Sequence, residues 1–143
     1  MMGTSAFVQG TIPMTPENWE KLEVQQLVAE IREHWVGDQC DLDYEPDREV
    51  VEVAIGGHMS YSSSALLDDM MIELGRFAKP CGAVLSTEGE ESPVPLIVGP
   101  NDTSIFLADL DYSLKRIQES SHELETLILN FREKFEKEQT DEP

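Results

Sequence analysis

Covalent chemistry in this chain would require a base beside a nucleophile. The sequence of 143 residues contains three histidines. One of them, His58, follows the pair Gly56-Gly57 and lies close in sequence to Ser60 and Ser62. A serine next to a base is the arrangement that nucleophilic catalysis needs, so the segment Gly56–Tyr61 is the candidate catalytic or ligand-binding site. A glycine pair is also typical of a plain turn, and this second interpretation stays open.

Six carboxylates in one segment match the ligand offsets of a calcium-binding loop. Counted from Asp41, they occupy offsets 1, 3, 5, 7, 9 and 12. The loop needs glycine at its sixth position for a sharp turn, and Pro46 stands there. The flanking residues also alternate as strands do. The sequence contains no paired zinc ligands and no phosphate-binding glycine motif either, so we expect neither a metal ion nor another cofactor.

The net charge is the most unusual property of the sequence. It contains 29 Asp and Glu against 10 Lys and Arg, a formal net charge of −19, which is more than solubility requires. Residues 37–58 hold seven acidic residues and one basic residue, and residues 81–102 hold four acidic residues and no basic one. Salt adaptation would enrich acidic residues throughout the chain. The uneven distribution therefore indicates either a surface for a basic partner or a sheet face that is polar because it is solvated.

Hydrophobic periodicity predicts an α+β domain. Strands are expected at 6–12, 40–45, 51–55, 82–87 and 94–98. One helix is expected between Thr15 and Gly37, and another between the serines of 60–64 and Pro80. We expect Gly56-Gly57 to end the third strand. This element order is that of a ferredoxin-like (split βαβ) antiparallel sheet with helices on one face, plus an extra strand and a long C-terminal amphipathic helix.

Alternation within residues 40–45 predicts a row of carboxylates. Asp41, Asp43 and Glu45 share one strand face, at a spacing of about 6.6–6.8 Å. One strand of duplex DNA carries a charge about every 3.4 Å of axis, so two or three such rows approach the charge density of a phosphate backbone. We therefore predict a partner-binding surface made of Asp41, Asp43, Glu45, Asp47, Glu49, Glu52, Glu88, Glu90 and Glu91.

The last part of the chain has a heptad pattern. Eight residues, here called the seam, follow one another at steps of four and three: Leu110, Leu114, Ile117, Ser121, Leu124, Ile128, Phe131 and Phe135. The pattern predicts a long helix over residues 109–138, after a domain of residues 1–108 and before a frayed tail at 139–143. The seam either packs on the domain or forms a homodimer or a partner contact through its apolar residues. Ser121 would set the register in each case.

The remaining composition favours a cytoplasmic protein. Two cysteines, Cys40 and Cys81, cannot form a disulfide framework, and free thiols suit a reducing compartment. The sequence shows no signal-peptide pattern, and no apolar run approaches the roughly 20 residues of a membrane span. Nucleic acid and anionic membranes would both be repelled by the acidic surface, so neither is an expected partner.

These patterns together favour a non-enzymatic binding protein with a basic, nucleic-acid-binding protein as its partner. The acidity and size resemble the general character of DNA-mimic proteins. That resemblance implies an inhibitor that occupies the basic groove of a nucleic-acid-handling enzyme, of the anti-restriction or anti-CRISPR kind used by phages. The alternatives are an immunity-type protein that neutralises a basic toxin, and a small enzyme or ligand-binding domain centred on Gly56–Tyr61.

Overall fold

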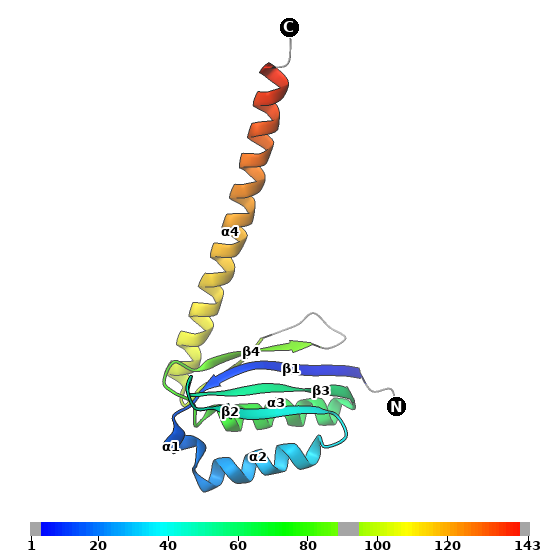
Figure 1. The fold of residues 1–143 in the computed structure, drawn as a ribbon, viewed down its shortest axis with the longest axis vertical. Helices are drawn as coiled ribbons and strands as arrows, with labels where there is room; N and C mark the ends of the chain where they lie inside the picture. The colour runs from blue at the N-terminus through cyan, green and yellow to red at the C-terminus, as the bar shows by residue number, and fades with distance from the viewer. Residues whose placement is uncertain (1–3, 89–94, 141–143) are drawn as a thin grey trace. The chain divides into compact units, whose positions relative to one another are not determined.

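The protein has an α+β fold with a five-stranded antiparallel sheet and a long C-terminal helix (Figure 1). The computed structural model describes residues 4–88 and 95–140. Its elements are β1 (Thr4–Pro13), α1 (Pro16–Trp19), α2 (Leu22–His34), β2 (Gln39–Glu45), β3 (Val50–Met59), α3 (Tyr61–Gly75), β4 (Ala83–Glu88), β5 (Leu96–Val98) and α4 (Asp102–Thr140). Residues 1–109 and 110–143 form two compact units, called the sheet domain and the C-terminal segment below.

The sheet has the strand order β2-β3-β1-β4-β5, and all neighbouring strands are antiparallel. The first strand of the chain is therefore the central one. β1 and β3 pair over ten residues, from Thr4 opposite Met59 to Pro13 opposite Val50. Among the described residues, β1 and β4 pair over three, from Phe7 opposite Glu88 to Gln9 opposite Ser86.

Helices α2 and α3 cover one face of the sheet, as Figure 1 shows. The core lies between these two layers because every second strand residue points toward the helices. Its buried side chains include Val24, Val28 and Ile31 from α2, Leu67, Met71 and Leu74 from α3, and Val8, Ile12, Leu42, Val51, Val53, Ile55 and Leu85 from the strands. The opposite side of the sheet, here called the open face, presents the residues in between.

The helix expected between Thr15 and Gly37 consists of two helices. Thr15 caps α1, because its hydroxyl oxygen accepts a hydrogen bond from the backbone N–H of Asn18 at 3.2 Å. The backbone is extended at Lys21 (ψ 140°), and α2 begins at the next residue. The break accompanies the stacking of Trp19 on Tyr44 of β2, with ring centroids 5.2 Å apart.

The expectation that Gly56-Gly57 ends the third strand is wrong, because β3 continues to Met59. Both glycines pair with β1, Gly57 opposite Ala6 and Gly56 opposite Phe7. A Cβ on Gly56 would lie 2.1 Å from Cδ2 of Phe7 and 2.6 Å from the carbonyl oxygen of Ala6. Glycine here permits a close approach within the sheet, which is a second meaning of glycine inside a strand pattern.

The C-terminal helix α4 begins at Asp102, ahead of the expected start at residue 109. Asn101 caps it: its side-chain oxygen accepts a hydrogen bond from the backbone N–H of Ser104 at 2.9 Å. Ser104 and Ala108 are buried within the sheet domain. This first part of the helix precedes the heptad pattern, so periodicity alone does not reveal it. All seven apolar residues of the seam lie in the C-terminal segment and are exposed.

Candidate binding surface on the open face

Two neighbouring strands bring three carboxylates together on the open face. Along β2, Leu42 is buried in the core, whereas Asp41 and Asp43 on either side of it are exposed. On β3, Glu52 is exposed between buried Val51 and Val53, and it stands opposite Asp43 in the strand register. The alternation of the two strands thus places Asp41, Asp43 and Glu52 side by side.

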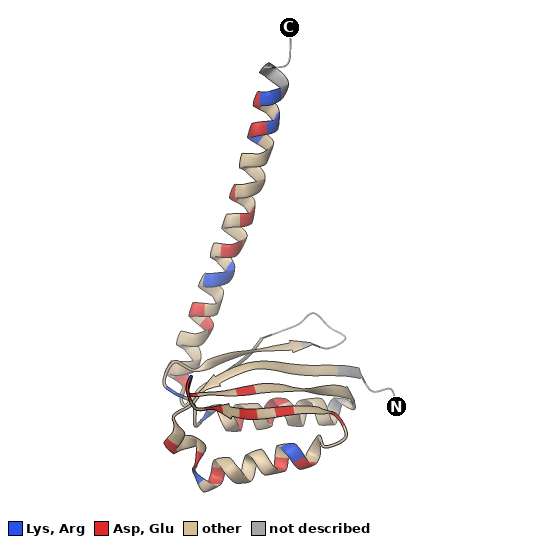
Figure 2. Cartoon of the chain, in the orientation of Figure 1, with Lys and Arg blue, Asp and Glu red and all other residues tan. Residues whose placement is uncertain are grey.

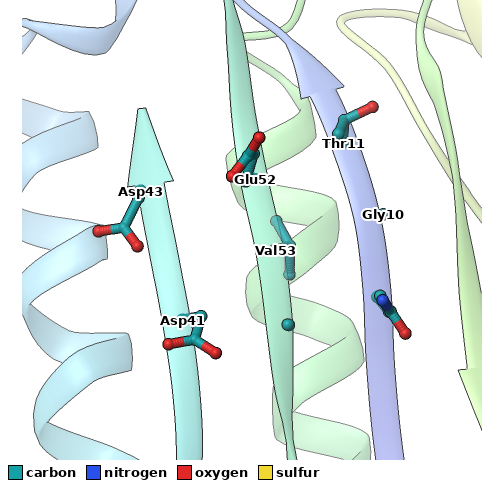
Figure 3. Close-up of a pocket in the computed structure, with 8 residues that line it drawn as sticks. Gly10, Thr11, Asp41, Asp43, Glu52 and Val53 are labelled. Carbon is teal, nitrogen blue, oxygen red and sulfur yellow. The ribbon is translucent and has the colours of Figure 1, made fainter. Parts of the chain in front are cut away.

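These carboxylates border a shallow hollow of about 430 Å³ (Figure 3). Its lining is completed by Gln9, Gly10 and Thr11 from β1 and by Val53 and Ala54 from β3. The register explains the depression. Ala54 has Gln9 as its partner on one side and Asp41 on the other, so a methyl group lies between two longer side chains.

The hollow keeps a negative character although two arginines lie near it. Arg32 is 3.7 Å from Asp43, and Arg48 is 3.5 Å from Glu52. All four side chains are mostly exposed, and exposed ion pairs of this kind are weak. Asp41 accepts a hydrogen bond from Gln39 at 3.1 Å, and no basic side chain of the described residues lies within ion-pair distance of it. Figure 2 shows acidic residues along β2 and β3.

The other residues predicted for the binding surface are not brought to this hollow. Glu45 is half-buried at the end of β2, and Asp47 is exposed in the following turn. Glu49 has a positive φ of 51°, and its Oε2 lies 3.0 Å from Nζ of Lys79. This ion pair ties the hairpin to the segment after α3, so Glu49 has a structural role. The backbone of Glu88 lies in β4, and Glu90 and Glu91 lie outside the described residues.

The segment Gly56–Tyr61 has structural roles for several of its residues. Gly56 and Gly57 belong to the β1–β3 ladder. Ser60 caps α3, because its hydroxyl oxygen accepts a hydrogen bond from the backbone N–H of Ser63 at 3.2 Å. His58 is exposed at the end of β3, and among the described hydrogen bonds none joins it to Ser60 or Ser62. The geometry therefore offers no assembled nucleophile and base at this position.

Among the described residues, three titratable groups have pKa values raised by burial. The Cys40 thiol faces the helices, and burial raises its pKa, with the Arg32 charge acting in the opposite direction. Burial likewise raises the pKa of the Tyr44 hydroxyl, which donates a hydrogen bond to the carbonyl oxygen of Met14 at 2.9 Å. On α3, burial and the neighbouring Asp69 charge raise the pKa of Asp68. None of the three groups lines the open-face hollow.

Sequence reasoning missed the contribution of β1 to the hollow. Gln9 and Thr11 are polar residues spaced two apart in a predicted strand, which places them on one face. Their position beside Glu52 and Ala54 depends on the pairing of β1 with β3, and strand periodicity does not specify pairing.

A second hollow of about 610 Å³ lies on α2 and α3, and its lining residues are Glu30, Glu33, His34, Leu66 and Met70. No pattern in the sequence indicates this hollow.

Residues 4–88 and 95–140 contain neither of two further kinds of site. No group of three or more His, Cys, Asp or Glu side chains in these ranges is arranged to hold a metal ion. No helix there combines the length and the apolar character needed to cross a bilayer.

No protein-family model matches this chain, and neither a curated protein nor a solved structure does so.

Proposed function

We propose that this is a non-enzymatic binding protein whose open face binds a basic surface of a nucleic-acid-handling protein. One observation carries the proposal: Asp41, Asp43 and Glu52 come from two strands and border one exposed hollow. Such a concave acidic surface fits lysine and arginine side chains that would otherwise contact phosphate. Complementary charge would give fast, salt-dependent association.

The arrangement of like charges supports a role in binding. Asp43 and Glu52 stand directly opposite each other across β2 and β3, and like charges in this position destabilise a sheet. A solvated face needs only polar residues, such as the Gln9 and Thr11 that β1 presents nearby. Arg32 and Arg48 offset part of this repulsion through exposed, weak ion pairs, and a basic partner would relieve the remainder.

The spacing of the carboxylates supports mimicry of a phosphate backbone. Neighbours along β2 are about 6.6–6.8 Å apart and the strands about 4.8 Å apart. A DNA strand carries one charge for about every 3.4 Å of axis. The patch is sparser than DNA but of the same order, so a groove built for DNA is the partner surface that we propose, as in an anti-restriction, anti-CRISPR or immunity-type inhibitor. A cytoplasmic location belongs to the same proposal.

The proposed scaffold for this surface is a ferredoxin-like sandwich extended by β5. The order β2-β3-β1-β4 has β3 between β2 and β1, as expected when a βαβ unit is split by an inserted antiparallel strand. The two helices α2 and α3 then occupy the face opposite the carboxylates. In this arrangement Asp41, Asp43 and Glu52 are exposed on the open face, where a partner could contact them.

The test removes the three charges without changing side-chain size. A variant with Asp41→Asn, Asp43→Asn and Glu52→Gln is compared with a control, Glu17→Gln, Glu20→Gln and Glu23→Gln. The control residues are exposed on α1, directly after it and at the start of α2, and they carry the same charge. Each immobilised protein is exposed to host lysate at low and high salt, and the proteins released by salt are identified. Each captured protein is then competed with duplex DNA.

We expect the open-face variant to lose capture and the control to retain it, with duplex DNA displacing the captured protein. Equal capture by the open-face variant and the unmodified protein would show that this surface is not the binding site. Equal loss in both variants would mean that only the bulk charge matters. Capture that DNA does not displace would retain a binding protein but reject nucleic-acid mimicry.

A further inference from the structure

The C-terminal segment exposes an apolar stripe, interrupted at Ser121, that its own helix cannot bury. Of the fifteen large hydrophobic side chains that are exposed in the described chain, nine lie between Leu110 and Phe135. The seven apolar seam residues are 52–71% exposed. Exposed apolar patches of this extent mark interaction surfaces in soluble proteins.

The seam follows the heptad positions of a two-stranded coiled coil. Leu114, Ser121, Ile128 and Phe135 occupy the a positions, and Leu110, Ile117, Leu124 and Phe131 occupy the d positions. We propose that a second copy of this chain covers the seam, and that the two helices run antiparallel. This proposal is independent of the function of the open face.

The apolar area of the seam is of the size that a stable dimer needs. A large side chain that is fully buried removes on the order of 100 Å² or more from water, and aromatic side chains remove 150–250 Å². Seven such residues, each more than half exposed, therefore contribute about 1,000 Å² from two copies before the flanking side chains are added. Stable interfaces bury about 1,200–2,000 Å² in total.

The charge of the segment also permits a second copy to approach. The C-terminal segment contains nine acidic and five basic residues, of which residues 110–137, the part that holds the seam, contain six and five; residues 1–109 contain 20 acidic and five basic residues. Two nearly neutral helices can pair without the repulsion that two sheet domains would experience. In a parallel pair, both strongly acidic sheet domains would be joined to the same end of the coiled coil. An antiparallel pair places them at opposite ends, about 40 Å of helix apart for 28 residues.

Side-chain size favours the same orientation. Aligned in parallel, Phe131 and Phe135 would each face their own copies in two consecutive layers, and Ser121 would face Ser121. Aligned antiparallel over the full seam, each a residue faces a d residue, so Phe131 faces Leu114 and Phe135 faces Leu110 of the second copy. Ser121 then faces Leu124. Each layer that contains a phenylalanine therefore pairs it with a smaller leucine. Opposing large and small side chains in this way gives uniform packing.

The flanking charges distinguish the two orientations most clearly. In the antiparallel register, Asp111 at an e position lies beside Arg132 at the e position of the second copy, and symmetry produces this pair twice. Asp111 already has Lys115 of its own helix 3.3 Å away, but its two carboxylate oxygens can accept from both cations. In the parallel register, Arg132 would lie beside Leu127 of the second copy and no such ion pair would form.

The oligomeric state is tested with the full chain by light scattering coupled to size-exclusion chromatography. We expect twice the chain mass of 16.1 kDa. Ile128→Asp should raise the dimer dissociation constant by at least about a hundredfold, whereas Thr126→Asp, which introduces the same charge on the opposite side of the helix, should have little effect. Both side chains are exposed in the single chain, so neither variant should unfold it.

A monomer at the highest soluble concentration, or a trimer or tetramer, would overturn the proposal. In the monomer case the seam would belong to another protein or to the sheet domain. Equal behaviour of the Ile128→Asp and Thr126→Asp variants would also overturn it, because the dimer would then use another surface.

The orientation is tested by charge reversal. Asp111→Arg and Arg132→Asp should each weaken the dimer about threefold to tenfold, and the double variant should recover most of the lost affinity. Losses that simply add in the double variant would refute the antiparallel register, because residues 111 and 132 would then not meet.

Discussion

Replacement of Gly56 by alanine tests whether this glycine is needed for the packing of the sheet or for a functional turn. The added Cβ would lie 2.1 Å from Cδ2 of Phe7 and 2.6 Å from the carbonyl oxygen of Ala6, both far inside van der Waals contact. The Phe7 ring can turn, but the carbonyl belongs to the paired strand, so β1 and β3 must separate locally. Overpacking typically costs 1–3 kcal/mol, and because a backbone ladder is strained here we expect a loss of about 3 kcal/mol in the free energy of unfolding.

The chain offers a matched control for this measurement. A Cβ at Gly37 would meet no atom within 4 Å, so Gly37→Ala should change the free energy of unfolding by no more than about 0.5 kcal/mol. Both variants are compared with the unmodified protein by urea unfolding, followed by far-ultraviolet circular dichroism at one protein concentration.

Removal of the ring should relieve part of the strain. In a Phe7→Ala background, the cost of Gly56→Ala should fall, although the contact with the Ala6 carbonyl oxygen remains. If Gly56→Ala is as stable as Gly37→Ala, the close approach does not exist in solution and the packing argument fails. The glycine pair would then regain its interpretation as part of a functional turn.

Three other substitutions have expected effects on stability. Asp68→Asn should stabilise the protein at about pH 7. Burial raises the pKa of Asp68 in the folded state, so the charged carboxylate lowers the free energy of unfolding above that pKa. The stability gained by Asp68→Asn should vanish below the ordinary Asp pKa of about 3.9, where the carboxyl is neutral in both states. A gain that is independent of pH would contradict this cause. Asn101→Ala removes the cap on Ser104 and should cost about 1 kcal/mol, whereas Asn101→Asp should cost little, and urea unfolding of both variants measures this. Tyr44→Phe leaves the carbonyl oxygen of Met14 without its donor and should cost about 1 kcal/mol in the same assay; an unchanged midpoint would mean that water replaces the hydroxyl.

Sequence periodicity was sufficient for the types and order of most elements. Alternation around Leu42 placed Asp41 and Asp43 on one face because the strand period is two, independent of any other element. The expected end of β3 is wrong because the glycine at position 56 is required by the close approach of Phe7, which lies 49 residues earlier in the chain and pairs with it. Local patterns contain no information about such a contact.

Strand periodicity predicts only part of the lining of the candidate hollow. The row on β2 follows from residues 40–45 alone, but the hollow also needs Gln9 from β1 and the small side chain of Ala54 between them. Those positions come from strand order and register, which long-range packing determines. Glu49 has a partner that its charge and position in the sequence do not indicate: its Oε2 lies 3.0 Å from Nζ of Lys79, which joins the hairpin to the segment after α3.

The unequal lengths of the strand ladders determine how the sheet domain would yield under mechanical load. β1 and β3 share ten residue pairs, whereas β4 has three with β1 and three with β5 in the described chain. Local opening begins where the fewest bonds must break, so β4 and β5 should detach while β1, β2 and β3 remain together. The chain runs from β5 directly into α4. Tension on that helix would therefore reach the shortest ladders first, and the carboxylates on β2 and β3 would stay together while β4 and β5 separate from the sheet.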